Sequence, residues 1–261
     1  MTLRVAVLGH GTIGKVVAER IAAGAVPGAH LVALIARHEE PDAPAPVVDL
    51  ATALERADVV VECAGQEAVR TMGPAVLDAG RTLVVSSVGA LADPVLRARL
   101  QQACGRLVLT PGAIGGLDLL TAAIDAAPFD GVRVRSTKKP RALVQGWMSD
   151  AEQERLRTAT AASLVFTGSP ADAARLFPTS LNVAATVALA VGSWDRVTVE
   201  LNADPDADLT THEIEAWGPV GHYSWRIQNQ PSESNPRTSA IVPYAVLRTV
   251  AALTSAPPLI A

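Results

Sequence analysis

The first part of the chain alternates between short apolar runs and segments with the pattern of a helix. Continuous apolar residues predict buried strands at 3–8, 30–36, 59–63, 83–86 and 107–109. Helix-like segments lie at 15–23, 66–79 and 95–103. Strands that are apolar throughout and are separated by helices are typical of a parallel sheet covered on both faces. Residues 1–110 are therefore expected to form an α/β domain with a doubly wound parallel sheet.

The pattern changes after Pro111. Residues 132–136, 197–201 and 213–217 alternate apolar and polar side chains, which predicts strands with one wet face in a mixed or antiparallel sheet. A helix of small residues is predicted at 182–191. Residues 111–237 are therefore expected to form a second, smaller α/β domain. The apolar segment 238–253 predicts a last helix, and residues 238–261 are expected to pack back on the first domain.

Composition narrows the class of protein. The chain has 261 residues, of which 49% are hydrophobic and 18% charged, so two small domains are expected and wholesale disorder is excluded. The net charge of −4 gives no basic patch, and we expect no nucleic-acid partner. Residues 1–9 do not resemble a signal peptide, and no run reaches the ~18 apolar residues of a membrane span. The expected location is the cytoplasm, with no membrane partner.

A glycine-rich loop follows the first predicted strand and opens the first predicted helix. It is Gly9-His10-Gly11-Thr12-Ile13-Gly14. This GxGxxG spacing is typical of a Rossmann domain, because its glycines permit a tight turn and let the backbone approach a pyrophosphate at a helix N-terminus. We expect the five residues of this loop other than His10 to bind NAD or NADP. The alternative is a tight turn that holds no ligand.

The end of the second predicted strand bears on the choice between NAD and NADP. An Asp or Glu at this position accepts hydrogen bonds from the ribose hydroxyls of NAD. This chain has Arg37 here, and Glu39 follows it. Arg37 can meet the 2′-phosphate of NADP or stack on adenine, so we predict that NADP is accepted. A ribose contact from Glu39 and a purely solvated Arg37 are the alternatives.

Residues capable of acid–base chemistry are scarce, with five His, two Cys and three Lys. Cys63 and Cys104 have neither metal-ligand spacing nor the setting of a nucleophile, so no metal site is expected. His212 lies on the apolar side of a predicted strand, where it is either a core histidine or a site residue; imidazole suits proton transfer near neutral pH. Lys138 ends another strand, where it either meets a substrate carboxylate or is simply solvated.

Further short motifs follow the predicted strands and helices. They are Glu62-Cys63-Ala64-Gly65, Ser87-Val88-Gly89-Ala90, Pro111-Gly112-Ala113-Ile114-Gly115-Gly116, Thr137-Lys138-Lys139-Pro140, Phe166-Thr167-Gly168, Phe177-Pro178, Leu181-Asn182-Val183-Ala184-Ala185, Asp204-Pro205, His212-Glu213-Ile214 and Asn235-Pro236-Arg237-Thr238-Ser239. In this order the set resembles the L-aspartate dehydrogenase family. The resemblance covers nearly the whole chain and implies that residues 111–237 form the catalytic and dimerisation domain.

The resemblance implies a homodimeric enzyme that uses NAD or NADP to oxidise L-aspartate to iminosuccinate, or that runs the reverse amination. Hydrolysis of the imine gives oxaloacetate and ammonia. The family's catalytic histidine matches His212, and its nicotinamide contacts match Ala113 and Asn182. From the residues alone, Asn182 is equally a helix cap. The loop that contains Ala64 is also expected to contact the cofactor.

Two positions depart from the family, which usually has Asn where this chain has Ser180 and Thr210. Both replacements are shorter hydroxyl side chains that lack the two-headed amide. We expect Ser180 and Thr210 to lie beside the substrate, as Lys138 does, so aspartate becomes a less secure choice of substrate. The alternatives are a related amine or imine oxidoreductase with a shifted substrate, and a non-catalytic NAD(P)-binding module.

Overall fold

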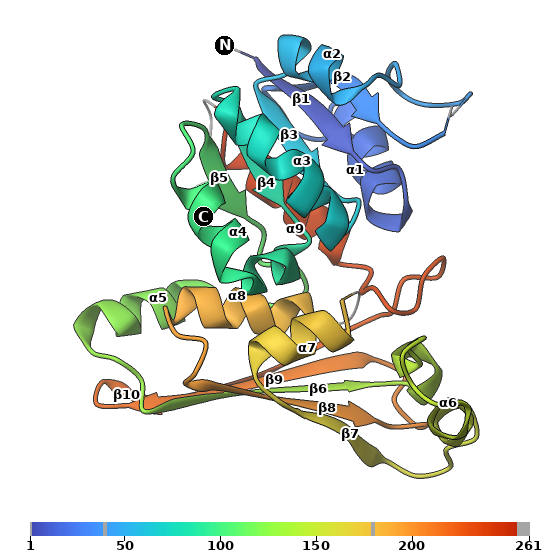
Figure 1. Ribbon diagram of the computed structural model, residues 1–261, viewed down its shortest axis with the longest axis vertical. Helices are drawn as coiled ribbons and strands as arrows, with labels where there is room; N and C mark the ends of the chain where they lie inside the picture. Colours follow the sequence, from blue (N-terminus) through green and yellow to red (C-terminus); the bar gives the residue numbers. More distant parts are fainter. Residues whose placement is uncertain (1, 39–40, 179–180, 255–261) are drawn as a thin grey trace. The chain divides into compact units, whose positions relative to one another are not determined.

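The computed structural model describes residues 2–38, 41–178 and 181–254 (Figure 1). The chain divides into two compact units. The first comprises the residues up to Gly112 and those from Val242 onward, and the second comprises residues 113–241. The chain therefore leaves the first unit close to residue 110 and returns to it for its last helix.

A parallel sheet of five strands forms the first unit. In spatial order its strands are β2 (Ala29–Ile35), β1 (Leu3–Leu8), β3 (Val59–Glu62), β4 (Thr82–Val85) and β5 (Arg106–Leu109). Outside β2, one further parallel bridge joins Leu34 to Val47. With Val47 counted as a one-residue strand, the order is 3-2-1-4-5-6, which is that of the Rossmann fold. The predicted doubly wound parallel sheet is confirmed.

The first unit also contains helices. They are α1 (Thr12–Ala22), α2 (Leu50–Arg56), α3 (Gln66–Asp78), α4 (Pro94–Gln101), α9 (Val242–Ala251) and the 3-10 helix η1 (Val88–Ala92). Helix α9 packs against α1, and Val246 and Val250 share a buried core with Val17. The last helix begins four residues later than the predicted residue 238, because Ser239 is held in a β-bridge with Pro231.

A mixed sheet forms the second unit, as predicted, and it has five strands, of which the sequence predicted the three with residues 132–136, 197–201 and 213–217. In spatial order its strands are β10 (Gly221–Asn229), β9 (Thr210–Gly218), β6 (Gly131–Lys138), β8 (Val197–Ala203) and β7 (Ser163–Gly168). Strands β6 and β8 run parallel, and the other neighbours are antiparallel. Helices α5 (Leu117–Ala126), α7 (Pro170–Leu176) and α8 (Asn182–Ala190) cover one face of this sheet (Figure 1). Helix α6 (Asp150–Arg157) and the 3-10 helix η2 (Pro140–Leu143) belong to the connection from β6 to β7.

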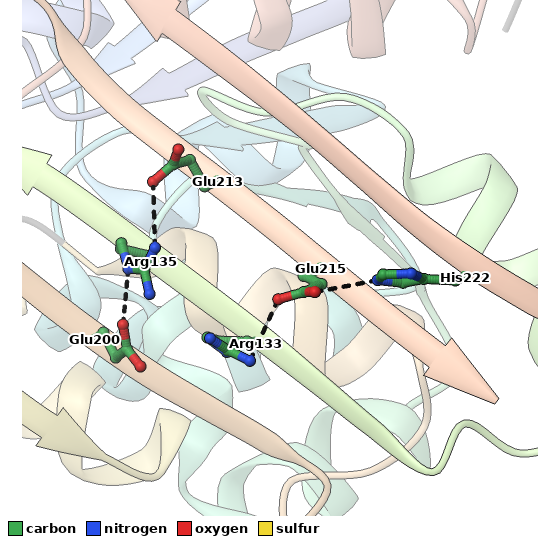
Figure 2. Close-up of polar contacts among 6 residues, drawn as sticks. All are labelled: Arg133, Arg135, Glu200, Glu213, Glu215 and His222. Atoms are coloured by element: carbon green, nitrogen blue, oxygen red, sulfur yellow. Dashed lines mark hydrogen bonds and ion pairs between the residues drawn. The ribbon is translucent and has the colours of Figure 1, made fainter.

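The two faces of the second sheet differ in chemistry, because alternate residues of a strand point to opposite sides. Along β9, Thr210, His212 and Ile214 are buried on the helix-covered face. The opposite face carries a network of ion pairs. Figure 2 shows Arg135 between Glu200 and Glu213, and Glu215 between Arg133 and His222. The acidic neighbours of His212 in the sequence therefore lie on the other side of the sheet.

Within the described ranges, no helix combines the length and the apolar character that crossing a membrane requires.

Candidate functional site

The glycine loop connects β1 to α1 at the carboxyl edge of the parallel sheet. Gly9 has a φ of +96°, and a Cβ on it would come within 2.8 Å of Ala64. A Cβ on Gly14 would collide with the carbonyl oxygen of Gly9, whereas a Cβ on Gly11 would meet nothing within 4 Å. The first and third glycines therefore allow the turn and the close packing of helix on strand. The second leaves backbone open to an approaching pyrophosphate.

A pocket of about 530 Å³ lies beside this loop. Gly9, Gly11 and Ala64 line one part of it, and Arg37 lines another. Thr12 and Ile13 form the first turn of α1, which carries no acidic side chain, so the positive end of the helix dipole suits a phosphate. Among the described residues Arg37 has no ion-pair partner. The pocket therefore fits the adenosine and phosphate part of a dinucleotide.

A buried carboxylate orders the loops that follow β3 and β4. One oxygen of Glu62 accepts hydrogen bonds from the backbone of Ala64 and Gly65 and from the hydroxyl of Ser87, at 2.7–2.8 Å. The other accepts from the backbone of Ser86 and Ser87 at 3.2 and 2.9 Å. Burial raises the pKa of Glu62, and these bonds oppose the rise. The sequence signal for this role is a charged residue that ends a wholly apolar strand.

In the second unit, the structure brings His212, Lys138 and Thr210 together on the covered face of the sheet. His212 is 1% exposed, and its Nδ1 lies 2.8 Å from Oγ of Ser136. Lys138 is 4% exposed, and its ammonium donates to the backbone carbonyl of Arg237 at 2.8 Å. Lys138 is therefore a buried cation, and the solvated alternative is wrong for it.

Burial changes the proton affinity of both side chains. Burial lowers the pKa of Lys138 to about 8. Burial, together with the nearby charge of Lys138, lowers the pKa of His212 to about 3. No carboxylate within the described part of the chain pairs with Lys138. A buried cation without a counter-ion is unfavourable, so this face favours an anionic ligand beside a neutral imidazole.

Two side chains of β10 donate hydrogen bonds to the loop that follows β5. The side-chain amide of Asn229 donates to the carbonyl of Ala113 at 2.9 Å, and the indole of Trp225 donates to that of Gly115 at 3.1 Å. Gly116 has a φ of +77°, and a Cβ on it would lie 2.9 Å from the Trp225 ring. Neither Trp225 nor Asn229 was singled out in the sequence, because each contacts a segment more than 100 residues away.

The sequence analysis also singled out Asn182, Ser180 and Glu39. Helix α8 is capped at Leu181, and Asn182 is its first residue, so the helix-cap interpretation of Asn182 is wrong. Ser180 and Glu39 lie outside the described residues. In the parts of the chain that are described, no group of three His, Cys, Asp or Glu side chains is placed to hold a metal ion.

A Rossmann sheet with a phosphate loop is typical of dinucleotide-binding proteins, and two family matches place this chain among the NAD(P)-dependent oxidoreductases. Residues 9–106 match the family described as homoserine dehydrogenase, NAD binding domain, and residues 118–253 match the family described as aspartate dehydrogenase, C-terminal.

Similar proteins narrow the class. An L-aspartate dehydrogenase of Ruegeria pomeroyi is 38% identical, over 94% of this chain and 90% of that protein. One of Methanosarcina barkeri is 35% identical, over 95% of this chain and 96% of that protein. The crystal structure of aspartate dehydrogenase from Thermotoga maritima superposes with a TM-score of 0.77 at 27% identity, and the match covers 100% of both chains. The chain belongs to the L-aspartate dehydrogenase family.

Proposed function

We propose that the protein oxidises L-aspartate to iminosuccinate with NAD or NADP, and that water then converts the imine to oxaloacetate and ammonia. The reverse amination follows the same path. The observation that carries the proposal is the buried Lys138 beside His212, since a dicarboxylate supplies the negative charge that this face lacks. Membership of the aspartate dehydrogenase family supports the same substrate.

Each group has one task in the proposed reaction. Lys138 holds a substrate carboxylate, and Thr210 donates its hydroxyl to the same ligand. His212 accepts the proton that the substrate amine loses, and the negative charge of the bound dicarboxylate raises the pKa of the imidazole from its low value in the empty site. NAD or NADP, when bound, would supply the acceptor for the hydride of Cα. Loss of this hydride and of the amine proton leaves the C=N bond of iminosuccinate.

The proposal assigns the following residues to the cofactor. The glycine loop, Arg37 and Ala64 hold the phosphates and the adenosine, and the pocket beside them has the size and the open backbone that such a ligand needs. Ala113 and Asn182 contact the nicotinamide.

Steady-state kinetics test the proposal. Rates are measured with L-aspartate and either NAD or NADP, and in reverse with oxaloacetate, ammonium and either reduced cofactor. We expect turnover in both directions. A clear preference for another amino acid in a substrate screen would identify a related amine oxidoreductase with a shifted substrate. Absence of turnover with every amino acid, together with retained cofactor binding, would identify a binding module and contradict the proposal.

Replacement of His212 tests its role in proton transfer. His212→Ala is expected to lower kcat by ~10²–10⁴ because the amine proton then has no acceptor. The matched control is His222→Ala on the opposite face, where His222 is exposed and contacts Glu215 at 3.1 Å (Figure 2). The control should keep the parent rate. Near-parent turnover of folded His212→Ala would reject the assignment.

We further propose that the protein is a homodimer, because the family resemblance implies this assembly, and that it is located in the cytoplasm. Light scattering coupled to size-exclusion chromatography measures the mass directly, and a mass near 27.1 kDa, that of one chain, would contradict the dimer.

A further inference from the structure

The structure places Ser136 in contact with His212, and no sequence motif indicated this pair. The two residues are direct partners in the antiparallel pair of β6 and β9. Ser136 is 0% exposed and His212 is 1% exposed. Oγ of Ser136 lies 2.8 Å from Nδ1 of His212, which is the distance of a good hydrogen bond. The register of two strands therefore sets one ring nitrogen against a buried hydroxyl.

This hydroxyl is the one hydrogen-bond partner of the imidazole within the described residues. The contact uses Nδ1 and leaves Nε2 for a ligand. No carboxylate lies against the ring from its own strand, because Glu213 and Glu215 project to the other face of the sheet. Lys138 is the charged group near the ring. The ring is thus oriented by a neutral group.

We propose that Ser136 is a positioning residue: its hydroxyl engages Nδ1 of His212 and makes Nε2 the nitrogen that exchanges the proton with the substrate amine. The proposal rests on the proposed function. In the reacting state Nδ1–H donates to Oγ, and the lone pair of Nε2 accepts the proton. The hydrogen bond persists when the ring becomes charged, because Nδ1 carries a hydrogen in both states.

A hydroxyl differs from a carboxylate in this place. A carboxylate would favour the charged imidazolium by direct attraction and would also pair with the nearby Lys138. A hydroxyl can accept from Nδ1–H or donate to Nδ1, so it fixes the orientation of the ring without adding charge, and in the proposed reacting state it accepts. Lys138 therefore stays available for the substrate carboxylate, and His212 stays neutral until the substrate delivers its proton.

Three substitutions separate the hydroxyl from the volume of the side chain. Ser136→Ala removes the hydroxyl and is expected to lower kcat roughly tenfold to hundredfold, with the KM for the cofactor unchanged. Ser136→Thr and Ser136→Val add equal volume at a buried position, and only Thr keeps a hydroxyl. We expect the Thr variant to turn over at least tenfold faster than the Val variant. Equal rates for these two at equal melting temperature would overturn the proposal.

Nuclear magnetic resonance supplies a readout that does not depend on aspartate turnover. The ¹⁵N shifts of the His212 ring report which nitrogen carries the proton. In the wild-type holoenzyme with succinate bound, we expect Nδ1 protonated and Nε2 unprotonated, and in Ser136→Ala a mixture of the two neutral forms. Failure of the proposed function would appear as absent turnover with these shifts intact. Identical ring shifts in both proteins would overturn the role of Ser136.

Discussion

At the scale of single residues, burial decides which ionisable groups carry chemistry. Lys138 and Lys139 are adjacent, yet Lys138 is 4% exposed, whereas Lys139 is exposed and lies 3.4 Å from Asp208. Alternation along β6 explains the difference, because the strand ends at Lys138 with its side chain on the covered face. Glu62 is also buried, but five hydrogen-bond donors surround its carboxylate. Glu62 is a satisfied structural anion, and Lys138 is a cation prepared for a ligand.

The lowered pKa of Lys138 predicts a pH dependence for binding of dicarboxylates. Because its folded-state pKa of about 8 lies below the usual value, the ammonium form is disfavoured on folding. The associated stability penalty is present below pH 8 and disappears as the pH rises above it. The charge that attracts a carboxylate disappears over the same range. The inhibition constant of succinate against L-aspartate should therefore rise above about pH 8.

Matched variants test the same residue. Lys138→Met should weaken succinate roughly ten- to hundredfold and flatten the pH profile, since a charge-assisted hydrogen bond contributes ~1.5–3 kcal/mol. Lys139→Met should keep both the affinity and the profile of the parent. The role of Lys138 is refuted if the two variants behave alike.

Glu62→Gln should destabilise the first unit. An amide offers one acceptor oxygen, so at least two of the five donors would face an NH₂ group, at ~1–3 kcal/mol each. Hydrogen exchange should accelerate at the amides of Ala64, Gly65, Ser86 and Ser87, and urea unfolding followed by circular dichroism should shift to lower concentration. The control Glu55→Gln changes an exposed carboxylate on α2 and should leave both unchanged. Unaltered exchange in Glu62→Gln would show that the carboxylate does not hold these loops.

At the scale of elements, β10 holds the loop that follows β5 by two hydrogen bonds, which we call the clamp. Its inward side chains Trp225 and Asn229 each hold one carbonyl of the 113–116 loop. Asn229 also stands opposite Thr210 in the register of β9 and β10. One strand therefore links the covered face that carries His212 to the loop proposed to meet the nicotinamide.

At Gly116, the Trp225 ring leaves no room for a side chain. Gly116→Ala places a Cβ against the Trp225 ring and strains a backbone with φ of +77°, for which L-residues incur ~1–2 kcal/mol. We expect a lower melting temperature and a raised KM for the cofactor. Gly115→Ala is the control, because a Cβ there meets nothing within 4 Å. If the two variants had the same melting temperature and the same KM for the cofactor, the clamp would have no role in cofactor binding.

At the scale of the whole molecule, the phosphate loop and the buried Lys138–His212 face belong to different units. Each unit buries its own core and organises its own group of ligand contacts. Substitutions that affect the cofactor phosphates and those that affect the substrate carboxylate should therefore be separable in kinetics. The ion-pair network of Arg133 and Arg135 (Figure 2) belongs to neither group. His212 alternates with Glu213 along β9 and therefore lies on the other face of the sheet.

Cofactor choice tests this separation. Arg37→Ala should raise the KM for NADP roughly ten- to hundredfold and change that for NAD far less, because only NADP carries the 2′-phosphate that the guanidinium meets. The inhibition constant of succinate should not change. Arg56→Ala, on α2, is the control for loss of one surface charge. Equal losses with both cofactors would instead indicate stacking on adenine.

The choice of His212 among the histidines came from the family resemblance. The sequence by itself determined the parallel sheet, the phosphate loop and three strands of the mixed sheet. These features depend on periodicity and on residues that are neighbours along the chain, so the pattern contains them directly. Only the tertiary structure decided that Ser136 faces His212 from 76 positions away, that Glu62 collects donors from the loop after β4, and that Lys138 lacks a carboxylate partner among the described residues. Each depends on the register between separate strands or on burial by other elements. No local pattern encodes these relations, because they arise only when distant segments pack together.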